Sequence, residues 1–315
     1  MARVAVPLRF GATLRRRPRE RRLRAPLGVY LFIAPSILLL LVFSYYPIFS
    51  AFYHSLYAWD GVNSRFVGFA NFAAMLADDP LHQSVPHVLL LAAAAVTFAL
   101  TLPLLAAELI FNLHSERWRF LYRVLFTIPM VVPWIVTVLV WQFFYDPIDG
   151  PINRVFLALG MENFARGWLG EPRTALGAIA LMGFPFVAGL NLLIYLAGLN
   201  SISTEVLDAT KLDGATFWQR FLHVDIPLIR GQIRLIVILT TITQIQNFAP
   251  VLILTKGGPG YSTMVPGMWM YQNAFVFGKM GYASAIGVVL FAVMLALTAV
   301  NTRLIRSGEE YEPRR

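Results

Sequence analysis

Long uncharged, apolar runs alternate with short polar segments along this chain of 315 residues. Six runs contain no Asp, Glu, Lys or Arg, and they cover residues 25–59, 80–107, 124–145, 174–204, 235–255 and 280–302. A helix rises about 1.5 Å per residue, so about 20 residues cross the roughly 30 Å of hydrocarbon in a bilayer. Each run is long enough, and we therefore predict an all-α polytopic membrane protein with six transmembrane helices.

The predicted helices lie within a transmembrane domain of residues 25–305, between a basic tail (1–24) and a short carboxyl-terminal tail (306–315). Their expected bounds are about 28–52, 86–109, 121–145, 174–199, 232–254 and 281–304. A seventh uncharged run, 257–278, is rich in Gly, Pro, Ser, Thr, Gln and Asn. These residues would leave polar groups unpaired in lipid, so we predict a short interfacial or re-entrant helix there.

Composition and the distribution of charge agree with a membrane protein. The chain is 57% hydrophobic and only 14% charged, whereas a soluble domain carries about 25% charged residues. With the amino terminus inside, 20 of the 26 Lys and Arg residues fall in inner segments. The positive-inside rule therefore predicts that both termini and the polar loop 203–230 are cytoplasmic. Because the basic residues flank apolar runs, the net charge of +9 does not indicate nucleic-acid binding.

The loop 203–230 is the long charged stretch between two strongly apolar runs, and it reads as helix, turn, helix. Ser203 is a suitable N-cap and Glu205 suits the positive end of the helix dipole. Gly214 should break this first helix. A second short helix is predicted over 215–224, ended by Pro227.

Three short motifs in this loop are spaced as in a known family. They are Asp208-Ala209-Thr210, Asp213-Gly214-Ala215 and Ile226-Pro227. Their spacing resembles the signature loop of ABC importer permeases, and the Asp-Gly-Ala form resembles the carbohydrate-uptake branch for maltose, trehalose and glycerol phosphate. The chain departs from that pattern at Asp208 (for Glu), Thr210 (for Ala) and Gly231 (for a second proline), which leaves the exit angle of the loop open.

The resemblance extends over nearly the whole chain after the basic tail. Further matching segments are Ala34-Pro35, Tyr46-Pro47, Ile128-Pro129, the stretch 254–259 (LTKGGP) and the stretch 271–275 (YQNAF). It implies a permease subunit in a bacterial or archaeal cytoplasmic membrane. Implied partners are a second homologous permease, expected to form a heterodimer, two ATP-binding subunits and an extracytoplasmic solute-binding protein.

The resemblance also implies that loop 203–230 couples the chain to an ATPase subunit. The residues expected to do so are Glu205, Asp208, Ala209, Asp213, Gly214, Ala215, Phe217, Trp218, Arg220, Phe221 and Pro227. Asp208, Asp213 and Arg220 would supply polar contacts. The three aromatic residues would form an apolar anchor, although packing on the permease's own helix ends is an open alternative.

A sugar needs hydrogen-bonding groups and flat rings along its path, and such residues are conspicuous in apolar runs. The expected substrate-path residues are Gln244, Asn247, Asn191, Trp269 and Phe184, with Phe186 a further possible stacking platform. Bonding to a neighbouring helix or core packing is the open alternative for each. Glu108 lies at the inner end of the second run, and we expect it to form an ion pair with Arg117 or Arg119.

Several chemistries are missing from the sequence. There is no cysteine, the histidines have no metal-ligand spacing, and no Gly-x-x-x-x-Gly-Lys-Ser/Thr phosphate loop is present. We therefore expect a non-catalytic subunit with no bound cofactor or metal, and ATP and Mg on the partner ATPase. An ion-coupled secondary carrier is the alternative, but it would place a carboxylate in the middle of a span, where none is found. A membrane enzyme would want paired catalytic side chains near one interface, and none stands out.

Overall fold

The computed structural model describes residues 27–185 and 188–304, and the chain divides into two units, residues 1–49 and 50–315. Each unit is treated by itself. The predicted tails at 1–24 and 306–315, and Phe186, lie outside the described residues.

The described part of the first unit, residues 27–49, is helical and apolar. It holds α1 (Leu27–Leu40), a π-helical turn η1 (Leu41–Tyr45) and the start of α2 (Tyr46–His54). Every described side chain from Tyr30 to Phe49 is exposed. An apolar surface of this extent is expected to be covered by lipid or by another protein.

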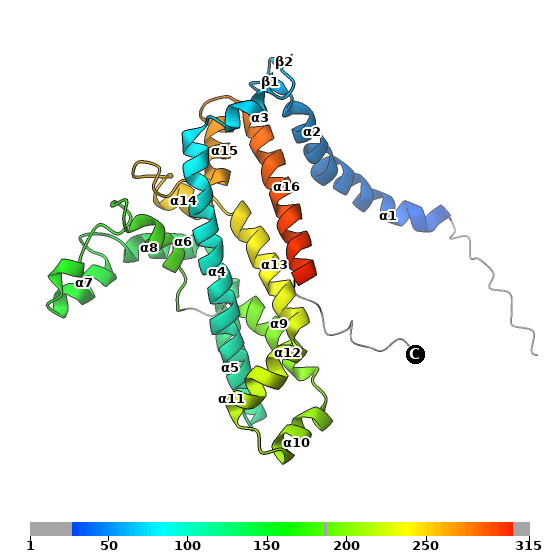
Figure 1. Cartoon of the computed structure of the whole chain (residues 1–315), viewed down its shortest axis with the longest axis vertical. Helices are drawn as coiled ribbons and strands as arrows, with labels where there is room; N and C mark the ends of the chain where they lie inside the picture. The colour runs from blue at the N-terminus through cyan, green and yellow to red at the C-terminus, as the bar shows by residue number, and fades with distance from the viewer. Residues whose placement is uncertain (1–26, 186–187, 305–315) are drawn as a thin grey trace, which may run out of the picture. The chain divides into compact units, whose positions relative to one another are not determined.

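The second unit is built around the long helix α4 (Asp79–Phe111), which packs against α9 (Gly189–Asn200) and α13 (Arg230–Gln246). In Figure 1, α4 runs beside α13. One core lies between these three helices and the segment 221–229. Its buried residues are Ala99, Leu104, Ala106, Ala107, Ile110, Leu192, Tyr195, Leu196, Leu199, Phe221, Ile229 and Ile236.

A small β-hairpin lies at the end of this unit where α4 begins, and we call this end of the unit the hairpin end (Figure 1). Strands β1 (Tyr57–Trp59) and β2 (Ser64–Phe66) pair antiparallel with Ala58 opposite Arg65. The other elements here are α3 (Ala70–Met75), α14 (Ala249–Leu254), α15 (Pro266–Phe275) and α16 (Met280–Leu304). A second core, with Val88, Val251, Met264, Met268 and Ile286 among its buried members, joins them to α4.

The opposite end of α4 is the loop end, where α10 and α11 lie (Figure 1). The polar loop forms α10 (Thr204–Leu212), α11 (Phe217–Arg220), a π-helical turn η4 (Phe221–Asp225) and α12 (Ile226–Leu228). The remaining elements of the unit are α5 (Glu116–Thr127), η2 (Ile128–Val131), α6 (Trp134–Phe144), α7 (Pro151–Ala158), η3 (Glu162–Phe164) and α8 (Ala175–Leu181).

Four of the described helical segments are long and apolar enough to cross a membrane. They are Tyr30–His54, Asp79–Phe111, Arg230–Leu254 and Met280–Arg303, and the number reaches six if two bent helix pairs each form one span. The predicted third helix is bent by 88° between Val131 and Trp134, where Pro133 cannot continue a helical hydrogen-bond ladder.

The prediction of one continuous helix over 174–199 is wrong. Helix α8 ends at Leu181, and Gly183 follows with a φ of +94°, a left-handed conformation that glycine adopts without steric cost. Proline at 185 also disfavours the helical conformation of Phe184 before it, and α9 begins at Gly189. The short helix predicted within 257–278 is confirmed as α15, which has 10 residues.

Candidate functional site

A cavity of about 270 Å³ lies where α4, α9 and α13 meet the break after α8. Four of the five predicted substrate-path residues line it: Phe184, Asn191, Gln244 and Asn247. They come from two separate segments of the sequence, 184–191 and 244–247. The packing of α9 and α13 on α4 brings these two segments together.

The cavity combines amide groups with aromatic faces. Among the described residues, the side chains of Asn191, Gln244 and Asn247 have no hydrogen-bond partner, so their donors and acceptors are available to a ligand. The ring of Phe184 lies 5.4 Å from that of Phe98, with 36° between the ring planes. No charged side chain lines the cavity among the residues that the structure describes. Phe98 and Thr240 also line it; neither stood out in an apolar run, so the sequence carried no signal for them.

Trp269 does not belong to this cavity. Its side chain is buried, and its indole Nε1 donates a hydrogen bond of 2.8 Å to Asp78 Oδ2. The hydroxyl of Tyr282 donates to the same oxygen, while Asp78 Oδ1 caps α4 by accepting from the Leu81 backbone N–H at 3.0 Å. Trp269 therefore joins α15, α16 and the start of α4 at the hairpin end.

Replacing Asp78 with alanine should destabilise the hairpin end. The change removes an N-cap, worth about 1 kcal/mol, and leaves the buried Trp269 donor unpaired, at a cost of about 1–3 kcal/mol. We expect a lower melting temperature in detergent, measured by intrinsic tryptophan fluorescence. Asp79→Ala, at the neighbouring first-turn position, is the control, and an equal loss of stability in both variants would contradict this role for Asp78.

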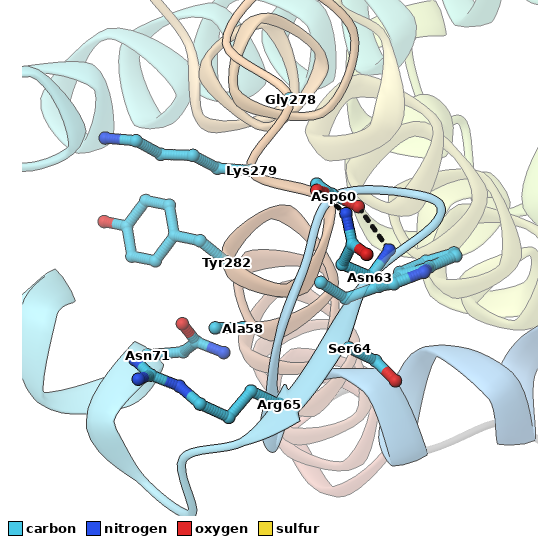
Figure 2. Close-up of a pocket in the computed structure, with 10 residues that line it drawn as sticks. Ala58, Asp60, Asn63, Ser64, Arg65, Asn71, Gly278, Lys279 and Tyr282 are labelled. Carbon is cyan, nitrogen blue, oxygen red and sulfur yellow. Dashed lines mark hydrogen bonds between the residues drawn. The ribbon is translucent and has the colours of Figure 1, made fainter.

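A second cavity, of about 490 Å³, opens at the hairpin end (Figure 2). Its lining includes Trp59, Arg65, Lys279 and Tyr282, and Figure 2 shows the side chains of Arg65, Lys279 and Tyr282 extending toward the same side. Asp60 also lines it, but its carboxylate accepts hydrogen bonds within its own turn. Neither Arg65 nor Lys279 forms an ion pair with any residue in the described part of the chain. With two basic side chains and one acidic side chain, Asp60, the described lining carries a net charge of +1.

The polar loop has the predicted helix, turn, helix form. Gly214 follows α10 with a φ of +66°, and its N–H donates to the Lys211 carbonyl while the Ala215 N–H donates to the Thr210 carbonyl. This pair of bonds is a Schellman cap, which favours glycine at the left-handed position. Thr216 then caps α11 through a capping box with Gln219.

Pro227 does not end the second helix as predicted. A π-helical turn over Phe221–Asp225 precedes it, and the helical path continues through α12 to Leu228. A π turn uses i→i+5 hydrogen bonds, so the wider turn accommodates a proline that lacks an N–H.

Most of the residues predicted to contact an ATPase lie on the exposed surface of this loop. The exposed ones are Glu205, Asp208, Ala209, Asp213, Gly214, Ala215, Phe217 and Trp218. Hydrogen bonds from the Glu205 backbone and from Ser203 lower the pKa of the Glu205 carboxyl, so it carries its negative charge at neutral pH. Pro227 is half-buried, and Phe221 packs in the core against α4 and α9, the alternative left open for the aromatic residues.

Arg220 is directed into the molecule. Its guanidinium pairs with Glu108 and Asp225, so the expected pairing of Glu108 with Arg117 or Arg119 is wrong. Arg119 instead bonds Glu116, its neighbour one helical turn away. Burial lowers the pKa of Arg220, but hydrogen bonds to Asp225 and Glu108 raise it by more, so the net pKa lies above its ordinary value and the side chain stays charged.

Comparison with known proteins places these features in a family. A family model described as "Binding-protein-dependent transport system inner membrane component" matches residues 99–307. The sulfoquinovosyl glycerol transport system permease protein SmoG of Agrobacterium fabrum is 32% identical over 282 residues, which are 89% of this chain and 90% of that protein. The diacetylchitobiose uptake system permease protein NgcF of Streptomyces coelicolor is 31% identical over 309 residues, 93% of this chain and 88% of that protein.

A solved structure has the same fold. It is the bacterial alginate ABC transporter in complex with an alginate pentasaccharide-bound periplasmic protein. The matched chain has a TM-score of 0.78 and 20% sequence identity, and the match covers 90% of this chain and 96% of that chain.

Proposed function

We infer the function from the family, because this chain belongs to the binding-protein-dependent transport system inner membrane components and is a permease of the sugar-uptake type of ABC importer. We propose that it moves an uncharged di- or oligosaccharide into the cytoplasm. Partner subunits hydrolyse the ATP. The chain itself is the translocation subunit and not an enzyme.

The central observation is the cavity between α4, α9 and α13. Free amides of Asn191, Gln244 and Asn247 suit sugar hydroxyls, and the Phe98 and Phe184 rings offer flat apolar faces. A polyol phosphate would leave its charge without a counterion in this uncharged lining, which is costly at the depth of a membrane. The lining therefore favours an uncharged sugar over the polyol phosphates also taken up by this branch of permeases.

The charge distribution supports an orientation in a bacterial or archaeal cytoplasmic membrane. Six spans with both termini inside put the loop end in the cytoplasm and the hairpin end outside. In this orientation the exposed face of α10 and α11 meets an ATP-binding subunit. The side chains of Phe217 and Trp218, which are 38% and 59% exposed, would bind in an apolar pocket on the surface of that subunit.

The assembly we propose holds this chain, a second homologous permease and two ATP-binding subunits, and it receives sugar from an extracytoplasmic binding protein. The alginate transporter that shares the fold was solved with a sugar-bound periplasmic protein. In the orientation above, the positively charged cavity at the hairpin end faces such a protein. Acidic side chains on the binding protein would complement Arg65 and Lys279.

Reversing both charges, with Arg65→Glu and Lys279→Glu together, should weaken docking of the binding protein. We expect the binding-protein concentration that half-stimulates ATP hydrolysis to rise about tenfold, because long-range charge complementarity steers such encounters. The control is Arg154→Glu, at an exposed arginine on α7 that does not line this cavity. Equal behaviour of the control and the double variant would exclude the cavity as the docking site.

The proposed function is tested first by purifying the tagged chain from its native membrane in mild detergent and identifying its partners by mass spectrometry. We expect a second permease, an ATP-binding subunit and the binding protein. An ion-coupled secondary carrier, the competing function, would be recovered without any ATP-binding subunit, and that result would refute the importer proposal.

A further inference from the structure

A buried ion cluster joins the polar loop to the last turns of α4. Arg220 Nη2 lies 2.8 Å from Glu108 Oε1 and 2.5 Å from Asn112 Oδ1, and Arg220 Nε lies 2.9 Å from Asp225 Oδ2. The side chains of Glu108 and Asp225 are 0% exposed and that of Arg220 is 16% exposed. The cluster therefore connects residues that are 112 positions apart in the sequence.

The end of α4 forms a shaped socket for the guanidinium. Asn112 Nδ2 donates to Glu108 Oε1 at 2.7 Å and to the Glu108 carbonyl at 2.8 Å, which fixes the carboxylate that receives Arg220. The ring of Phe111 lies 5.9 Å from the guanidinium carbon. Arginine presents a planar fork of donors, so this arrangement sets the direction as well as the distance between loop and helix.

Stability alone is a poor explanation for this cluster. Buried ion pairs are often no more stabilising than apolar residues of the same volume, because both charges lose their hydration. Here one guanidinium faces two buried carboxylates, and one oxygen of each carboxylate, Glu108 Oε2 and Asp225 Oδ1, has no hydrogen-bond partner. What the cluster provides is a fixed geometry between two elements.

The helix that receives Arg220 is also a wall of the sugar cavity. Leu91, Ala95, Phe98, Ala99, Leu102 and Pro103, all on α4, line that cavity. Phe98 lies ten residues before Glu108, which is about 15 Å along a helix axis. If the polar loop moves Glu108, α4 moves with it, and the Phe98 ring on the same helix changes its position in the cavity wall.

We infer that Arg220 is a positioning residue that locks the ATPase-facing loop to α4, so that movement of the loop moves the wall of the sugar cavity. This inference rests on the proposed function. Arg220 was expected to contact the ATPase subunit, whereas here its guanidinium binds Glu108 and Asp225 of the permease itself. Without the lock, the loop would be joined to α4 only by apolar packing such as that of Phe221, which sets no fixed direction between the two elements.

The experiment measures the distance between spin labels on the loop and on α4 in the intact complex with its ATP-binding subunits. Cysteines are introduced as Leu89→Cys on α4 and Lys211→Cys on α10, two exposed positions in a chain without cysteine. The distance is recorded without nucleotide and with ATP bound. With Arg220 present, we expect the same distance in both states, because loop and helix move as one body.

In Arg220→Met, we expect the distance to shift between the two states and its distribution to broaden. ATP hydrolysis should continue while sugar uptake falls at least about tenfold, which separates lost coupling from lost assembly. Arg220→Lys keeps the charge but not the forked geometry, so its uptake should lie between wild type and Arg220→Met. Arg154→Met, an exposed arginine on α7, should behave as wild type.

Arg220→Met leaves two buried carboxylates unpaired and could fold poorly. A triple variant, Glu108→Gln, Arg220→Met and Asp225→Asn, removes every charge of the cluster at similar volume, and we expect it to assemble but to show the same shifted distance. The inference is overturned if the triple variant keeps a fixed distance and normal uptake, or if the wild-type distance itself changes with ATP. Failure to recover any ATP-binding subunit with the wild type would instead refute the proposed function.

Discussion

Replacing Gly214 with proline is expected to abolish recovery of the ATP-binding subunit and, with it, sugar uptake. Gly214 holds a φ of +66°, whereas proline is fixed near −65°. Proline would also delete the N–H that bonds the Lys211 carbonyl and would disfavour the helical conformation of Asp213 before it. The exposed faces of α10 and α11 would then no longer be held in one orientation. The amount of ATP-binding subunit that co-purifies with the tagged chain measures this.

The matched control is Gly214→Asn. Asparagine tolerates the left-handed conformation better than other side chains, and no atom lies within 4 Å of where its Cβ would stand. We expect this variant to retain the ATP-binding subunit. If both variants lost it, the side chain itself and not the turn would be responsible, and if both kept it, the turn would not matter for docking.

Replacing Gln244 with leucine is expected to reduce uptake about five- to tenfold, because a lost hydrogen bond to a sugar hydroxyl costs about 1–1.5 kcal/mol and a factor of ten corresponds to about 1.4 kcal/mol. The amide of Gln244 lines the cavity and has no partner among the described residues. Asn247→Leu should act in the same way. Neither change should alter recovery of the ATP-binding subunit.

Gln246 offers a control of the same residue type on the same helix. It is exposed and outside the cavity, and its Nε2 contacts Met294 Sδ at 3.4 Å. Gln246→Leu should leave uptake near the wild-type level. Equal losses in Gln244→Leu and Gln246→Leu would mean that the loss reflects helix packing and not sugar contact.

Some of this molecule could be predicted because the relevant signal is local. Charges that interrupt apolar runs indicate where helices end, and a glycine between two stretches with helical patterns predicts a turn. The amides of Asn191, Gln244 and Asn247 stood out because polar groups are rare in apolar runs. Their common cavity follows from the packing of α9 and α13 on α4.

What could not be predicted depends on contacts between distant residues. Arg220 finds Glu108 at a separation of 112 positions, while Arg117 and Arg119 are closer in sequence but were the wrong choice. Trp269 was assigned to the sugar path by its residue type, but its indole bonds Asp78, which is 191 positions away. The π-helical turn before Pro227 begins at Phe221, which is buried in the core against α4 and α9, and loop composition does not reveal that burial.

ATP-driven import of an uncharged sugar is tested most directly by measuring uptake into liposomes that contain the purified complex and its binding protein. Lactose and N,N′-diacetylchitobiose serve as uncharged probes, and alginate oligosaccharides serve as acidic ones. We expect entry of an uncharged sugar only with ATP supplied at the cytoplasmic side, and undiminished entry when ionophores collapse every ion gradient. Uptake driven by an ion gradient without ATP would contradict ATP-driven import, and ATP-driven entry of alginate oligosaccharides alone would contradict the assignment of an uncharged sugar.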